Sequence, residues 1–372
     1  MNITIPMVDP AAWHQSIQSE LEEAAVDVLR SGRFVMGELV ESFEKEAAHY
    51  LGVKYALACA NGTDALVLAL QAAGIGVGDE VLTTGFTFFA TAEAIMQVGA
   101  SPVLVDIDPK TFNLDPAELE RAISPRSKAV LVVHLFGQPA DLSSIQSVCE
   151  QHGLLLLEDC AQSFGAEYKK KQTGTFGIAG TFSFFPSKNL GGFGDGGMIT
   201  TNNKDVADKI RQLRNHGSSE QYIHDTIGYN SRLDEIQAAL LRVKLKHIDH
   251  FNRQRQSISR YYREALGGSD IIIPHESSEG THIYHQYTVV LPSNRDLVRK
   301  RLARKGVASA VYYPLPLHRQ KALQPALENR RKPELPMCEQ LAEHCLSLPI
   351  YPGMTREQID SVTEVLLKSV KA

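Results

Sequence analysis

The chain has 372 residues, of which 43% are hydrophobic and 22% charged, so its composition is globular and excludes disordered, collagen-like and coiled-coil classes. Its formal charge of -5 is spread without long runs of one sign, and the basic stripe typical of nucleic-acid binders is missing. The longest apolar runs are far shorter than the roughly 20 residues that span a bilayer, and the N-terminal residues lack a signal-peptide pattern. We therefore expect a cytoplasmic protein that binds neither nucleic acid nor membrane.

Short apolar strands alternate with helical stretches from residue 55 onward, which is the pattern of a largely parallel α/β sheet. Strands are predicted over residues 55–60, 80–84, 102–106, 129–135 and 154–159, and the helices between them over residues 63–73, 90–98, 116–123 and 142–152. Residues 160–202 are rich in Gly, Phe, Ser and Thr, and they predict short strands and tight turns.

The C-terminal part of the chain has a different pattern. A helix is predicted over residues 204–214 and a long one over 232–266, followed by a strand at 286–291 and helices at 295–305 and 354–371. Because the length exceeds what one hydrophobic core usually serves, we expect two domains. A large domain would span residues 1–250 and a small α+β domain residues 251–372, and the N-terminal segment could pack on the small one.

Cysteine and histidine spacing gives no metal signature. The five cysteines are widely spaced without a C-x-x-C pair, which predicts buried reduced thiols. Two H-x-x-H pairs, at 247 and 250 and at 282 and 285, lack a third ligand at a recognisable spacing. We expect no metal site.

Three segments carry residues suited to chemistry, and the first is Asn61 to Asp64. These residues lie where a predicted strand turns into a helix, and Gly62 would let a phosphate approach the unpaired N–H groups of the helix start. The same segment would equally serve only to cap the helix through Asn61 or Thr63.

The second segment is E-D-C-A-Q, residues 158–162, at the end of a predicted strand. In open α/β sheets ligands bind beyond the carboxyl ends of the strands, so Asp159 would face such a crevice. A carboxylate there could keep a pyridine nitrogen protonated through a charge-assisted hydrogen bond. A capping or surface role for the same acid remains open.

The third segment is G-T-F-S-F-F-P-S-K-N-L-G-G-F-G-D-G-G, residues 180–197. Lys188 lies between three phenylalanines and five glycines, so we expect its amine in a confined pocket, where burial lowers a lysine pKa and favours imine formation. Gly192, Gly194 and Gly197 spell the dinucleotide fingerprint G-x-G-x-x-G, which requires a strand before it and a helix after it. A strand is predicted after it here, and we reject a nicotinamide site.

With these motifs in their order, the chain resembles the DegT/DnrJ/EryC1/StrS sugar aminotransferases, which are fold-type I enzymes of pyridoxal 5'-phosphate (PLP). The resemblance runs from S-G-R-F-V-M-G (31–37) to S-L-P-I-Y-P-G-M-T (347–355). It implies a large domain with a mixed, mostly parallel sheet flanked by helices and a smaller C-terminal α+β domain. It also implies that Lys188 holds PLP as a Schiff base and acts as catalytic base and acid.

The resemblance implies roles for further residues, each at the position that matches the family motif. Asp159 would pair with the pyridine nitrogen, Gln162 would approach the ring hydroxyl, and Phe88 would stack on the ring. The phosphate would be held by Gly62, Thr63 and Ser183, and Asn230 of a partner subunit would complete the site. The family pattern therefore implies a homodimer with shared active sites and glutamate as amino donor.

The substrate that the resemblance implies is a keto sugar linked to a nucleotide. Two stretches, V-H-L-F-G-Q-P-A-D (133–141) and G-Y-N-S-R-L-D-E-I-Q-A-A (228–239), look more like family members that act on 3-keto than on 4-keto sugars. A dTDP- or UDP-linked 3-keto hexose is therefore the expected substrate, with a 4-keto sugar as the alternative. A non-catalytic regulator or binding module on the same fold is the rival of another class. His134, His318 and Arg33 are left without an assigned role.

Overall fold

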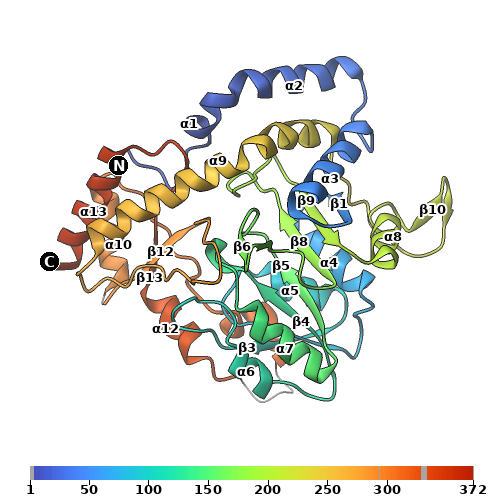
Figure 1. Ribbon diagram of the computed structural model, residues 1–372. Coiled ribbons are helices and arrows are strands. Elements are labelled where there is room, and N and C mark those ends of the chain that lie inside the picture. Colours follow the sequence, from blue (N-terminus) through green and yellow to red (C-terminus); the bar gives the residue numbers. More distant parts are fainter. Residues whose placement is uncertain (1–3, 293, 328–332, 372) are drawn as a thin grey trace.

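The computed structural model describes residues 4–292, 294–327 and 333–371. At its centre is a seven-stranded sheet in which β9 alone runs antiparallel to its two neighbours (Figure 1). Side by side, its strands are β1 (Tyr55–Cys59), β9 (Gly197–Thr201), β8 (Ala179–Ser183), β5 (Leu155–Asp159), β4 (Ser127–Val133), β2 (Glu80–Thr84) and β3 (Ser101–Val105). The predicted α/β class with a mixed, mostly parallel sheet is confirmed.

Helices cover both faces of the sheet, because alternate strand residues point to opposite sides. One face packs on α4 (Gly62–Ala72), α5 (Ala90–Gln97) and α8 (Lys204–Leu213). The other packs on α3 (Glu38–Leu51) and α9 (Glu235–Leu266) at one end, and on α6 (Pro116–Arg121) and α7 (Leu142–His152) at the other. The predicted alternation of strands and helices between residues 55 and 159 is confirmed to within two residues.

A separate hydrophobic cluster joins the two ends of the chain. It gathers the C-terminal half of α9 with β12 (Tyr287–Val290), β13 (Cys345–Leu348), α10 (Arg295–Arg304) and α13 (Arg356–Lys371). Ile5 and Trp13 lie in the same cluster, and Ile5 pairs with Val307. The N-terminal segment therefore packs on C-terminal elements, as the sequence allowed. The boundary predicted at residue 250 falls inside α9 and stays a prediction.

The remaining elements connect or decorate these layers. Besides four short 3-10 helices in the described part of the chain, they are the helices α1 (Pro10–His14), α2 (Gln18–Ser31), α11 (Gln324–Leu327) and α12 (Pro336–His344), and the strands β6 (Glu167–Tyr168), β7 (Lys171–Gln172), β10 (Ser218–Glu220) and β11 (Ile223–His224). Helix α2 lies along α9, and the β10–β11 hairpin projects from the body (Figure 1). Within the described ranges, none of the helices combines the length and the apolar character that crossing a membrane requires.

Candidate active site

Three of the predicted site residues, Gly62, Asp159 and Ser183, lie at one edge of the sheet. Asp159 is the last residue of β5 and Ser183 the last of β8, and these strands run parallel. Strand β1 has the same direction, because β9 lies between β1 and β8 and is antiparallel to both. Gly62 begins α4 just beyond β1. The carboxyl ends of three strands thus meet here, where open α/β sheets bind ligands.

The start of α4 forms a cradle with Ser183. A Cβ atom added to Gly62 would lie 2.7 Å from Ser183 Cβ, so only glycine allows this approach. Asn61 caps the helix by accepting a hydrogen bond from Asp64 N at 2.8 Å. Within the described part of the chain, the backbone N–H groups of Gly62 and Thr63 have no hydrogen-bond partner. Asn61 therefore caps the helix, and two N–H groups beside it are left for a ligand, so anion binding here stays a prediction.

Asp159 is a buried carboxylate with room for one more donor. Thr91 Oγ1 donates to its Oδ2 at 2.8 Å, and Ala161 N donates to its Oδ1 at 3.1 Å. A carboxylate has about four acceptor positions, so these two bonds leave it incompletely used. Burial raises the pKa of Asp159, while the two donors, Lys188 and His134 oppose that rise. A buried cationic N–H donor is the partner that would keep it ionised.

Lys188 follows β8 by five residues, and its amine has no hydrogen-bond or ion-pair partner among the described residues. Burial lowers the pKa of Lys188 to about 8, and the negative charge of Asp159 partly opposes this effect. About a tenth of the amine is therefore neutral at pH 7, far more than for a lysine with an ordinary pKa near 10.4. A neutral, unpaired amine is the form that reacts with an aldehyde or accepts a proton.

Gln162 is held from two sides. Its Oε1 accepts from Phe136 N at 2.6 Å, and its Nε2 donates to Tyr313 Oη at 3.1 Å. The Tyr313 ring also lies 6.1 Å from the ring of Phe88, which is 57% exposed. Sequence reasoning did not assign Tyr313 to the site. The one signal nearby is the Y-Y-P-L-P-L-H run at 312–318, which also contains His318.

Among the described residues, the side chain of Asn230 makes no hydrogen bond to this group, although the neighbouring Ser231 Oγ accepts from Ala60 N at 3.2 Å. It is exposed, it follows the β10–β11 hairpin, and its backbone pairs with Asn215. The apolar side chains of Tyr222 and Ile227 in the same loop are 87% and 91% exposed. The role of Asn230 in a partner's site remains a prediction.

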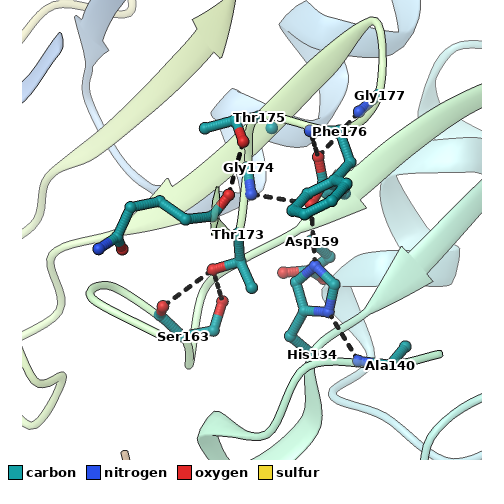
Figure 2. A network of polar contacts seen from close by, with 12 residues as sticks. His134, Ala140, Asp159, Ser163, Thr173, Gly174, Thr175, Phe176 and Gly177 are labelled. Carbon is teal, nitrogen blue, oxygen red and sulfur yellow. Dashed lines mark hydrogen bonds and ion pairs between the residues drawn. The ribbon is translucent and has the colours of Figure 1, made fainter. Parts of the chain in front are cut away.

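A polar network lies directly beside Asp159 (Figure 2). Glu158 accepts from the backbone N–H groups of Gly174, Phe176 and Gly177 at 2.7–2.9 Å. His134 Nε2 contacts Glu158 at 3.1 Å, while its Nδ1 accepts from Ala140 N, so the proton is placed on Nε2. Cys160 brings a third potential metal ligand to within 4.8 Å, but the oxygens of Glu158 are already used by these donors. The network is structural.

The other residues left without a role also have protein partners. His318 Nε2 contacts Glu339 Oε1 at 2.8 Å, and Arg33 forms an exposed ion pair with Glu38 at 3.4 Å. His318 Nδ1, by contrast, is buried and has no hydrogen-bond partner among the described residues.

The residues present fit the cofactor that the sequence predicted. A phosphate would find the free N–H groups of Gly62 and Thr63 beside Ser183, a pyridine nitrogen the open side of Asp159, and an aldehyde the free amine of Lys188. The family model of the DegT/DnrJ/EryC1/StrS aminotransferases matches residues 15–367. The chain belongs to this family.

The names of individual relatives describe different activities. A pleiotropic regulatory protein of Geobacillus stearothermophilus is 45% identical over 97% of this chain and 97% of its own length. A UDP-N-acetyl-3-dehydro-alpha-D-glucosamine 3-aminotransferase of Acidithiobacillus ferrooxidans is 44% identical over 99% of each chain. Among solved structures, S. venezuelae DesV in complex with a ketimine intermediate has 38% identity and a TM-score of 0.95, and the match covers 99% of both chains.

Proposed function

We propose that this aminotransferase uses PLP to transfer an amino group from glutamate to a nucleotide-linked 3-keto hexose, and that it works as a homodimer. The observation that carries the cofactor assignment is the pair formed by Lys188, whose pKa is lowered to about 8, and the buried Asp159 at the same sheet edge. When bound, PLP would supply a carbonyl that exchanges amino groups and a ring that accepts electron density.

The protein groups have separable tasks in this reaction. Lys188 would hold the cofactor. Once its amine is free, Nζ would take a proton from a carbon of the substrate and return it to a different atom. Asp159 would keep the ring nitrogen protonated, since Thr91 and Ala161 fix its carboxylate without using all of its acceptor positions. Gly62, Thr63 and Ser183 would bind the phosphate, Gln162 would contact the ring hydroxyl and Phe88 would cover the ring.

The 3-keto assignment is supported by the relative that is 44% identical and named for a 3-dehydro sugar. The two sequence stretches at 133–141 and 228–239 point the same way. The dimer is supported by the exposed apolar side chains of Tyr222 and Ile227 in the loop before Asn230, since exposed apolar side chains gathered in one segment are typical of interaction sites. Asn230 of one subunit would then complete the active site of the other.

The first test is an absorption spectrum of the purified protein before and after adding glutamate, followed by 3-keto and 4-keto nucleotide sugars. A visible band that glutamate removes and a 3-keto sugar restores is expected. Restoration by 4-keto sugars alone would overturn the regiochemistry. A protein that stays colourless with added PLP would favour a regulator, the class for which the 45% identical relative is named.

A further inference from the structure

The turn that follows Lys188 has few side chains with which to fix its own shape. It contains Gly191, Gly192 and Gly194, and a Cβ atom at 191 would lie 2.4 Å from Pro186 O. A Cβ atom at 192 would lie 2.9 Å from Gln237 Oε1, a side chain of α9. The glycines therefore let the backbone of the turn pack closely on itself and on α9. Since glycine restrains the backbone least, that shape needs support from outside.

Helix α9 supplies this support through a row of polar side chains at positions 237, 244 and 252. These positions are seven and eight residues apart, about two helical turns each, so they lie on one face. The row contacts alternate residues of the turn in antiparallel order. Asn189 Nδ2 donates to Asn252 Oδ1 (2.7 Å), Lys244 Nζ donates to Gly191 O, and Phe193 N donates to Gln237 Oε1 (2.8 Å).

Lys244 is the unusual member of this row. Its side chain is 1% exposed, and no carboxylate among the described residues pairs with it. Its amine lies 5.1 Å from the ring centre of Trp13 and 5.6 Å from that of Phe193. Burial, together with the nearby charge of Arg255, lowers the pKa of Lys244 to about 7. A buried amine without an acid partner is costly, and within the described residues the one hydrogen bond of Lys244 Nζ is to the turn.

Lys188 lies at the start of this turn. Because that amine has no partner of its own, its place in the pocket is set by the backbone from which it extends. We propose that Lys244 is a positioning residue for Lys188, fixing the glycine-rich turn through Gly191 O while Trp13 and Phe193 shield its amine from water. This inference rests on the proposed function of Lys188.

The experiment compares Lys244→Met, which keeps the length and loses the donor, with Lys246→Met on an exposed position of the same helix. Without cofactor, amide hydrogen exchange of residues 189–194 should rise about tenfold in Lys244→Met. Competitive acetylation against pH should show the pKa of Lys188 moving up from about 8 towards the ordinary lysine value, as water reaches the amine. With cofactor, kcat should fall about tenfold and KM should change less than about twofold.

Lys246→Met should match the wild type in all three measurements. Lys244→Gln retains an N–H donor and should restore exchange to within about threefold of wild type. A lowered melting temperature with unchanged exchange and unchanged Lys188 titration would overturn the proposal, because the role would then be stability alone. The first two readouts need no transamination. If only the proposed function is wrong, amide exchange and the titration of Lys188 can still change as expected in Lys244→Met, while Lys188→Ala leaves activity intact.

Discussion

Glu158 and Asp159 are neighbours at the end of β5, and both are buried, yet their surroundings are opposite. Glu158 accepts hydrogen bonds from three backbone N–H groups and contacts a histidine whose tautomer is fixed. Asp159 accepts one hydroxyl and one backbone N–H and lies within the field of an unpaired lysine. Because strand residues alternate in direction, the two carboxylates point to opposite faces of the sheet.

The difference teaches how to separate a structural acid from a functional one. A buried carboxylate with all of its acceptor positions used stabilises the fold and has little left to offer a ligand. One with positions left open, at a strand end where ligands bind, is poised for a cationic partner. Burial alone does not discriminate between them, whereas the hydrogen-bond inventory does.

The largest effect is expected from replacing Lys188, the lysine near the functional acid Asp159. Lys188→Ala should abolish transamination and leave PLP loosely held, since no other described group provides a free amine at this position. The measurements are product formation by mass spectrometry and retention of PLP after gel filtration. Cys160→Ala changes the residue next to Asp159, a buried thiol, and should retain activity. Full activity in Lys188→Ala would refute the mechanism.

Asp159→Asn should be the next most damaging change. A neutral amide cannot hold a protonated ring nitrogen, so kcat should fall on the order of 1,000-fold. Thermal stability should change little, because the burial that raises the pKa of Asp159 penalises its charge. Steady-state kinetics and calorimetry on the same preparation check both parts. A variant within tenfold of wild-type kcat would remove Asp159 from the mechanism.

Glu158→Gln should show the reverse pattern. The amide has one acceptor oxygen where the carboxylate has two, so buried N–H groups at 174–177 would lose a partner. We expect a loss of about 3 kcal/mol in unfolding free energy. At temperatures where the variant is folded, kcat should stay within about threefold of wild type. Equal losses of kcat in Glu158→Gln and Asp159→Asn would erase the distinction between the two acids.

A smaller effect is expected from Thr91, which contacts the functional acid Asp159. Thr91→Val removes the hydroxyl that donates to Asp159 at 2.8 Å and should lower kcat about tenfold, since one charge-assisted bond is lost. Thr87→Val is the matched control, because the Thr87 hydroxyl contacts Thr91 and not Asp159. It should lower kcat less than threefold. If the two valine variants behave alike, the hydroxyl contact to the carboxylate is not what matters.

The sequence predicted those parts of the molecule that local patterns encode. Alternation of apolar residues located β2 and α7 to the residue, and the position of Asp159 after a buried strand pointed to the sheet edge. Tyr313 could not be found in this way, since it meets Gln162 across 151 residues. Lys244 was equally hidden, because a lysine in an amphipathic helix suggests a solvated position. Only the packing of α1 and the glycine-rich turn on α9 buries it.

The smallest expected effect is a shift in the pH dependence of cofactor binding, which links Lys188 to Asp159. The neutral amine of Lys188 is the form that captures PLP, so recombination of cofactor with the free protein should speed up about tenfold per pH unit below pH 8 and level off above it. The negative charge of Asp159 raises the pKa of Lys188 against the lowering caused by burial. Asp159→Asn should therefore move the midpoint to lower pH, by less than about one pH unit.

Glu158→Gln should leave the midpoint in place, since its carboxylate is not among the charges that act on Lys188. Stopped-flow absorbance across pH 6–10 separates the midpoint from the plateau rate, and a midpoint that moves upward in Asp159→Asn would contradict the electrostatic coupling of the pair.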